Sequence, residues 1–331
     1  MQIDGWRVEA LGYESREDWL ELRRQDLTAS EAGALFGAHK YLTLRQLAVE
    51  KAFGENKPET SVMRRGKIME PAVVEAVRLD FGWRPVRVDT YLRGRAADPY
   101  LRAGATRDYM LPALSRDSML AGLREQALAL GWDQLGDEVN LALECKSVDE
   151  RVFDAEWGEH PPKYILVQAA MQAALAGAHG TIVACLVENR ARDLFLYAVP
   201  RKPAFELELF ERIADFWRRW EAGEEFAVEA KDNAGMAELY PQAENELVID
   251  LTAEAEEWQG LAAERARLKM QIETIKSRID EIEARFKDRL RGAVRAILPG
   301  WSITWKTNSA GVRTFKCDKA TALSQTQRKR R

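Results

Sequence analysis

The chain has 331 residues, of which 46% are hydrophobic and 31% charged, with a formal net charge of −4. This length allows one large domain with an appendage or two domains, and the charge excludes a uniformly cationic nucleic-acid binder. No apolar run could span a membrane, the N-terminus lacks signal-peptide features, and three scattered cysteines exclude a disulfide framework. We therefore expect a cytoplasmic, reduced protein.

The first eighty residues carry helical patterns. Residues 17–24 place apolar side chains at helical spacing, and a second helix is expected to begin at Ser30, a residue type that often caps helix N-termini. Further helices are expected over residues 41–53 and 61–80. The longer one contains Pro71, which removes a backbone donor, so a break or bend is expected there.

Alternating apolar residues predict the strands that follow. They cover residues 84–93, 101–106, 139–148, 181–187 and 193–199. An insertion at about residues 111–137, with a helical centre, separates the second strand from the third. Helices are expected over residues 162–176 and 204–222. This order predicts an α/β (α+β) fold over residues 1–222, with a central mixed sheet flanked by helices.

The remainder of the chain differs in composition. Residues 221–257 contain one basic and twelve acidic side chains, so we expect an acidic linker over 223–250. Apolar residues then recur in steps of three and four over 251–298, which predicts a coiled coil or a helical hairpin. Its seam comprises Leu261, Leu268, Ile272, Ile275, Ile279, Ile282 and Phe286, with Arg265 between the first two. Residues 299–331 are expected to form a β-hairpin and a basic tail.

Two short motifs carry the chemistry. In a strand, residues two apart point to the same face, so Glu144 and Lys146 project together and Cys145 points the other way. If Asp108 lies on a neighbouring strand, two carboxylates and one ammonium converge. Such a group suits metal-assisted phosphodiester cleavage, because carboxylate oxygens hold Mg²⁺ and a cation steadies the developing charge. A Glu-x-Lys sequence alone also occurs on many exposed strands.

Several fragments occur together in a recognisable order. They are Trp19-Leu-Glu-Leu-Arg23, Thr28-Ala-Ser-Glu31, Arg65-Gly-Lys-Ile-Met-Glu-Pro71, Ala105-Thr-Arg-Asp108, Leu143-Glu-Cys-Lys146 and Pro162-Lys-Tyr164 through Gln168. Over about residues 16–222, the chain resembles the YqaJ-type phage recombinase exonucleases. That family includes lambda exonuclease and belongs to the PD-(D/E)xK nuclease superfamily. The resemblance implies a restriction-endonuclease-like core.

The resemblance also implies roles for the residues of the cleavage centre. Asp108 and Glu144 match the main metal ligands, with the Cys145 backbone carbonyl as a third. Lys146 matches the residue that orients or helps to deprotonate the attacking water. Glu70 matches a residue that supports a second metal ion or a water. The ion implied is Mg²⁺ or Mn²⁺.

Other positions match residues that surround such a centre. Gln168 resembles the family's active-site glutamine, and Tyr164 lies one turn before it. Arg23 and Ser30 resemble a phosphate-binding pair for the DNA end, and Arg65 and Lys67 are further candidates for DNA contact. A serine at a helix N-terminus together with an arginine is also a sensible anion site on physical grounds. Equally, Ser30 could be a helix cap and Arg23 a surface residue.

The chain departs from the family pattern in three places. The first aspartate lies in Arg107-Asp108-Tyr109, where the family usually has Pro-Asp-Gly, so the local loop must differ. The insertion at 111–137 replaces a short hairpin, and it could cover the site, contact DNA or hold a partner. Tyr164 and Gln168 are four residues apart, where three are expected.

The function implied is a metal-dependent exonuclease acting 5′ to 3′ on linear double-stranded DNA. It would leave 3′ overhangs for phage or prophage recombination by single-strand annealing. Its partners would be DNA ends, an annealing protein and further copies of itself in a ring-shaped oligomer, with a trimer among the candidates. Two alternatives remain: an endonuclease or repair-type nuclease of the same superfamily, and an inactive DNA-binding scaffold. An iron–sulfur nuclease is disfavoured, because three isolated cysteines cannot supply four thiolates.

Overall fold

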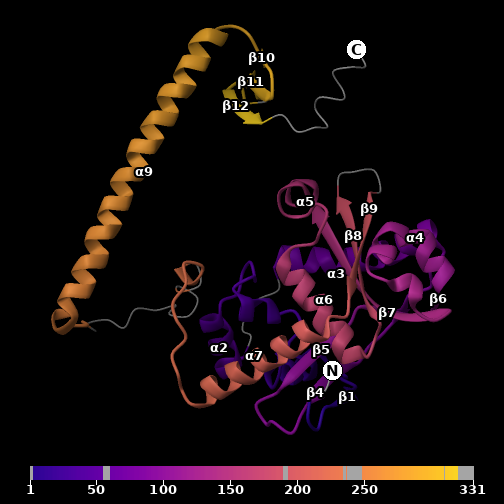
Figure 1. Cartoon of the computed structure of the whole chain (residues 1–331). Helices are drawn as coiled ribbons and strands as arrows, with labels where there is room; N and C mark the ends of the chain where they lie inside the picture. The colour runs from indigo at the N-terminus through magenta and orange to yellow at the C-terminus, as the bar shows by residue number, and fades with distance from the viewer. Residues whose placement is uncertain are drawn as a thin grey trace. The chain divides into compact units, whose positions relative to one another are not determined.

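The chain forms two compact units, Met1–Gln242 and Ala243–Arg331. The structure is a computed structural model that describes residues 3–54, 60–188, 193–233, 236, 248–308 and 310–319. Figure 1 labels the elements of both units. Part of the expected acidic linker and the basic tail beyond residue 319 lie outside the described residues. Within the described ranges, no helix is long and apolar enough to cross a membrane.

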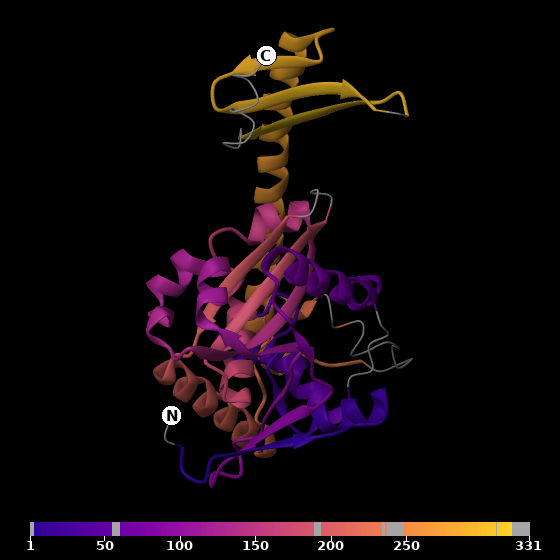
Figure 2. The same cartoon turned by 90° about the vertical axis from the view of Figure 1, so that its right-hand side faces the viewer.

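A five-stranded mixed sheet forms the centre of the first unit, as the sequence predicts. Its strands β7 and β8 are parallel, whereas the other neighbours are antiparallel. In spatial order the strands are β3 (Val86–Arg87), β6 (Tyr109–Ser115), β7 (Glu138–Asp149), β8 (Gly180–Glu188) and β9 (Leu194–Pro200). Helices cover both faces of this sheet (Figures 1 and 2).

The alternation of side chains along β7 explains how the sheet is covered. Leu141, Leu143 and Cys145 point into one apolar cluster with the helices α3 (Ser61–Phe81) and α4 (Arg116–Ala129). The opposite face packs against α5 (Glu150–Glu156) and α6 (Lys163–Ala176). In the apolar cluster on that face, β8 contributes Val183 and Cys185. Because successive residues of a strand face opposite sides, β7 can bury apolar residues on one side and present polar ones on the other.

A smaller sheet packs beside the central one. Its order is β1 (Arg7–Leu11), β4 (Tyr91–Arg95), β5 (Ala103–Thr106) and β2 (Leu27–Thr28). A second apolar cluster joins this sheet to the flanking helices. They are η1 (Ala32–Phe36), α2 (Leu44–Phe53), α6 and α7 (Pro203–Glu221), whereas α1 (Arg16–Arg24) lies next to β2 and adds no residue to the cluster. The beginning of the expected acidic linker also packs against this core, because Phe226 is buried and stacks on Phe216.

Two expectations about the strands are wrong. The segment expected as one strand over residues 84–93 is two, because β3 pairs in the large sheet and β4 in the small one. The insertion expected at 111–137 contains the expected helix, α4, but it begins with a strand that was not expected. Its first part belongs to β6, which pairs directly with β7, and a bulge at Pro112 and Ala113 interrupts the register. Proline lacks the donor that a regular ladder needs, so a bulge is a natural place for it.

The rest of the insertion is part of the structure's interior. It forms α4 and η2 (Trp132–Gln134), and Met119, Leu123 and Trp132 are buried in the cluster beneath the sheet. The neighbouring helix α3 is also more regular than expected. It runs without a break through Pro71 and ends at Gly82, whose positive φ of 68° suits a glycine after a helix.

The second unit has one long helix and a small antiparallel sheet. After η3 (Thr252–Glu254), α9 (Ala255–Leu290) is a single helix of 36 residues rather than a helical hairpin. The expected β-hairpin is confirmed by β11 (Trp301–Thr307) and β12 (Arg313–Lys319). A further strand, β10 (Arg295–Leu298), pairs with β11. Phe286 of the helix contacts Phe315 of the sheet, with ring centroids 5.9 Å apart.

Candidate active site

The structure brings together the two motifs that the sequence singles out. Asp108 lies in the connection between β5 and β6, beside β7. Its Oδ2 accepts a hydrogen bond of 2.9 Å from the backbone N–H of Cys145. Glu144 and Lys146 lie on β7 and form a short ion pair. Asp108 thus lies just before a neighbouring strand rather than on it, but the two carboxylates and the ammonium still converge, even though Pro-Asp-Gly is replaced in this chain.

Glu144 is the most constrained side chain of the group. It is 2% exposed, and both of its carboxylate oxygens accept hydrogen bonds from helix α6. Gln168 Nε2 donates to Oε1 at 2.7 Å, and Gln172 Nε2 donates to Oε2 at 2.6 Å. Gln172 also donates to the carbonyl of Thr106 at 3.1 Å, so it ties Glu144 to the end of β5. These bonds fix the orientation of the carboxylate.

Sequence reasoning missed Gln172, although a signal was present. Gln168 and Gln172 are four residues apart on one helix, so both side chains lie on the same face. Gln172 is 2% exposed, and a buried amide needs partners for its polar atoms. A second glutamine at this spacing, one turn after a candidate site residue, therefore indicates a shared acceptor.

The carboxylates influence one another electrostatically. Burial and the nearby charge of Glu144 raise the pKa of Asp108 to about 8. Burial also raises the pKa of Glu70, with the positive charge of Arg87 opposing this and the negative charge of Glu144 adding to it. Burial would lower the pKa of Lys146, but the carboxylates of Glu144 and Asp108 outweigh it and keep the amine protonated.

This arrangement of groups fits an oxygen-liganded divalent cation in its chemistry. Asp108, Glu144 and Glu70 lie close enough for their negative charges to repel one another. A bound cation would relieve that repulsion. In the ranges that the structure describes, no three His, Cys, Asp or Glu side chains are already grouped as a metal site. The thiol of Cys145 is excluded as a ligand by geometry, because it points into the apolar cluster, and burial raises its pKa.

Arg23 and Ser30 also lie together, but not as a helix cap. The Nη1 and Nη2 atoms of Arg23 lie 3.4 and 3.3 Å from Ser30 Oγ, and the guanidinium stacks over the Trp19 ring. Ser30 is not an N-cap, because η1 begins after Glu31 and has no side-chain cap. Trp19 Nε1 donates to Thr106 Oγ1 at 2.9 Å, which connects α1 to the strand that leads into the cleavage centre.

Glu31 and Lys51 form a buried ion pair next to Arg23. Glu31 lies 3.5 Å from Arg23 and 2.7 Å from Lys51, and it accepts the backbone N–H of Thr28 at 2.8 Å. Burial would raise the pKa of Glu31, but the charges of Lys51 and Arg23 and these hydrogen bonds lower it. Nothing in the sequence indicated Lys51, because it meets Glu31 through tertiary packing of α2.

The remaining predicted residues lie in other surroundings. Arg65 Nε lies 3.2 Å from Glu188, which also accepts a short hydrogen bond from Ser147, so Arg65 links α3 to the ends of β7 and β8. Lys67 is exposed on the same helix. Tyr164 begins α6 and packs against His39, with ring centroids 5.4 Å apart. Burial raises its pKa.

Comparison with known proteins identifies the region that contains these groups. Residues 18–179 match the family model described as the YqaJ-like viral recombinase domain. The chain carries a YqaJ-like viral recombinase domain. No curated protein matches the chain. Among solved structures, an alkaline exonuclease (LHK-Exo) from Laribacter hongkongensis has a TM-score of 0.44 and 15% identity, covering 68% of this chain and 100% of that chain. The same exonuclease in complex with dAMP has a TM-score of 0.43 and 14% identity, with the same coverages of 68% and 100%.

The YqaJ-like domain contains every residue that the sequence singled out for chemistry. It begins just before Trp19 and ends just after α6, so it includes both motifs and the two glutamines that hold Glu144. The strands β8 and β9, which complete the central sheet, both lie after the matched range. The candidate site residues therefore all lie in this domain, and the two following strands and helix α7 complete its packing.

Proposed function

We propose that the chain is a DNA exonuclease that depends on Mg²⁺ or Mn²⁺. It would digest one strand of linear duplex DNA from the 5′ end and leave a 3′ overhang. The observation that carries this proposal is the meeting of Asp108, Glu144 and Lys146 at the β6–β7 pair, with Gln168 and Gln172 fixing the central carboxylate. The YqaJ-like domain supports a nuclease of the phage recombination type.

The proposed mechanism follows from the charges of these residues. Asp108 and Glu144 would hold the ion, with the Cys145 carbonyl as a further ligand and Glu70 supporting a second ion or a water. When bound, such an ion polarises a phosphate oxygen and lowers the pKa of a coordinated water. Lys146, protonated beside the carboxylates, would orient the water by hydrogen bonding and stabilise the extra negative charge on the phosphate.

The supporting residues have roles that their contacts allow. Gln168 and Gln172 would prevent Glu144 from rotating away from the site, because each holds a different carboxylate oxygen. Tyr164 would line the entrance from the first turn of α6. Arg23 and Ser30 would bind the terminal phosphate, since a guanidinium and a hydroxyl together are a suitable pair of donors for an anion. Arg65 and Lys67 would contact the DNA backbone from α3.

The biological setting follows from the same proposal. A 3′ overhang is the substrate of an annealing protein, so a single-strand annealing protein is the expected partner in phage or prophage recombination in the bacterial host cytoplasm. A ring-shaped oligomer, for example a trimer, would keep the enzyme on its DNA. The second unit, including residues 251–298, for which a coiled coil remains the prediction, would support either assembly or contact with the annealing partner.

The test is a cleavage assay with Mg²⁺, and separately Mn²⁺, that compares end-labelled linear duplex with covalently closed circular DNA. We expect cleavage of the linear DNA alone, with release of the 5′ label, and loss of cleavage in an Asp108→Ala variant. Cutting of circles would replace this proposal with an endonuclease or repair-type nuclease. DNA binding without cleavage under either ion would favour an inactive scaffold.

A further inference from the structure

Helix α9 exposes a continuous apolar seam over most of its length. The helix is about 54 Å long, at 1.5 Å per residue for its 36 residues. Between 42% and 59% of the surface of each seam residue is exposed. They are Leu261, Leu268, Ile272, Ile275, Ile279 and Ile282. Among the described residues of the second unit, nothing covers the seam from Leu261 to Ile275, and an exposed apolar surface this long normally belongs to an interface.

The charges that flank the seam differ between its two halves. On one flank, Glu257 and Glu264 lie in the first half, whereas Arg278 and Arg285 lie in the second. When two copies of such a helix pack antiparallel, this flank of one copy faces the same flank of the other. With Ile272 of one copy opposite Leu268 of the other, Glu264 faces Arg278 and Glu257 faces Arg285.

The charged seam residue Arg265 distinguishes the two orientations. A parallel, in-register pair would place two Arg265 side chains in one layer of the seam, where like charges repel. The antiparallel register places each Arg265 opposite Ile275 of the second copy. The flanking charges alone favour neither direction, since a parallel pair would match Glu264 with Lys269. The antiparallel pair has one like-charge contact, between the two copies of Lys269, on the exposed flank.

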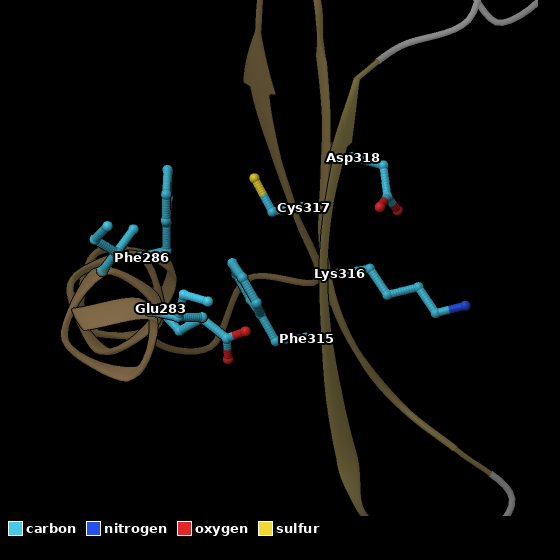
Figure 3. Close-up of a pocket in the computed structure, with 8 residues that line it drawn as sticks. Glu283, Phe286, Phe315, Lys316, Cys317 and Asp318 are labelled. Carbon is cyan, nitrogen blue, oxygen red and sulfur yellow. The ribbon is translucent and has the colours of Figure 1, made fainter. Parts of the chain in front are cut away.

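A groove at the C-terminal end of α9 provides a second, independent observation. It has a volume of about 550 Å³ and lies between the seam and strand β12. Figure 3 shows Phe315 and Cys317 pointing from β12 toward the helix, with Lys316 and Asp318 pointing away. In the antiparallel register, Trp258 of the second copy lies opposite Ile282, which lines this groove. Trp258 is 43% exposed in the single chain, so its indole is available to fill it.

We propose that α9 pairs antiparallel with α9 of a second copy of this chain, with Trp258 of each copy seated in the groove of the other. The seam supplies the apolar contact, Arg265 favours the antiparallel direction, and the groove fixes the register. This pairing is independent of nuclease activity, because none of its residues belongs to the cleavage centre. In this proposal the seam contacts a second copy of the chain rather than the annealing partner.

The test is a distance measurement between two copies of the full-length protein, without divalent metal. Gln259 is exposed on α9 and outside the seam, so it is replaced by cysteine and spin-labelled in a Cys317→Ser background; Cys145 and Cys185 are buried. In the antiparallel register, the two labels lie about 33 Å apart along the axis, from 22 residues at 1.5 Å each. A dominant distance below about 20 Å would overturn the proposal in favour of a parallel pair. Absence of a defined distance would overturn it in favour of another occupant.

Charge exchange tests the register within the same labelled protein. Arg278→Glu should weaken association about tenfold, because it converts two attractive contacts of the pair into repulsive ones. Adding Glu264→Arg should restore association, whereas a parallel pair would be weakened further. Arg267→Glu is the matched control: it also loses an ion pair within the helix, to Glu264, as Arg278 does to Glu281, but it lies off the seam flank. Equal effects of Arg267→Glu and Arg278→Glu would refute the register.

Discussion

Helices α7 and α9 have similar apolar periodicity but different surroundings. In α7, the apolar face is buried against the small sheet and η1, with Leu209, Phe210 and Ile213 fully inside. In α9, Leu290 is the one buried residue of the helix. Periodicity therefore establishes that a helix forms and which face is apolar, but not whether the same chain covers that face. In α7 the apolar face stabilises the folded unit, and in α9 it is available for association.

The largest expected effect is the loss of cleavage when Lys146 is removed from the first unit. Lys146→Ala should reduce cleavage by about 100- to 1,000-fold, because the site loses a preorganised cation beside the developing charge. DNA binding and the circular dichroism spectrum should be unchanged. Lys202→Ala, which removes an exposed lysine at the start of α7, serves as the control and should have a small effect on the rate. Retained cleavage in Lys146→Ala would contradict the role given to this residue.

The buried pair of Glu31 and Lys51 should make stability depend on pH. Glu31→Gln should cost about 3–5 kcal/mol at neutral pH, because Lys51 is left buried without its partner. The folded pKa of Glu31 lies below its ordinary value of 4.5, so this stabilisation is present above that pH and is lost as the pH falls through the folded pKa. Denaturant unfolding from pH 7 to 3 measures the gap between the two proteins. A gap that stays constant over that range would contradict this assignment.

The two helices can be compared directly by truncating one isoleucine in each. Ile213→Ala in α7 should lower the free energy of unfolding by about 2–5 kcal/mol, because it leaves a cavity in a packed core. Ile275→Ala in α9, where the side chain is 59% exposed, should change unfolding of the dilute protein by less than about 0.5 kcal/mol. Instead it should weaken association of α9. Equal costs in dilute solution would show that the seam is covered within the chain.

Gln172 offers a smaller test of how the first unit positions its carboxylate. Gln172→Ala should slow cleavage about 10- to 100-fold, because Glu144 loses the donor to one oxygen while its ligand atoms remain. Gln172→Glu should be worse than Gln172→Ala, because it adds a negative charge beside Glu144. A metal titration of the cleavage rate, with unfolding measured in parallel, separates positioning from a general loss of stability. Unchanged metal dependence in both variants would remove Gln172 from the site.

The smallest expected effect comes from removing the second unit. Deletion of residues 251–331 should leave single-turnover cleavage within about twofold, because no described residue of this unit belongs to the cleavage centre. Association should change much more, since α9 is lost. Rapid-quench cleavage and sedimentation of the truncated protein provide the two readings. A folded truncation that cannot cleave would show that the second unit completes the active site.

Local patterns in the sequence determined much of the first unit. Alternation along residues 139–148 predicted both the strand and the common direction of Glu144 and Lys146, because a strand has a fixed period of two. Helical periodicity over residues 41–53 and 61–80 located α2 and α3. The ordered fragments indicated the family, and the YqaJ-like domain was found over residues 18–179. These features depend on neighbours within a few positions or on the order of motifs.

Tertiary structure alone decided the features that depend on partners distant in sequence. The first part of the insertion became part of strand β6 because its residues pair with β7 across the sheet, and the segment 84–93 divided between two sheets for the same reason. Gln172 reached Glu144, and Lys51 reached Glu31, through the packing of helices on the core. A local pattern records which face of an element is apolar or charged. What lies against that face is set by chain segments that no local pattern specifies.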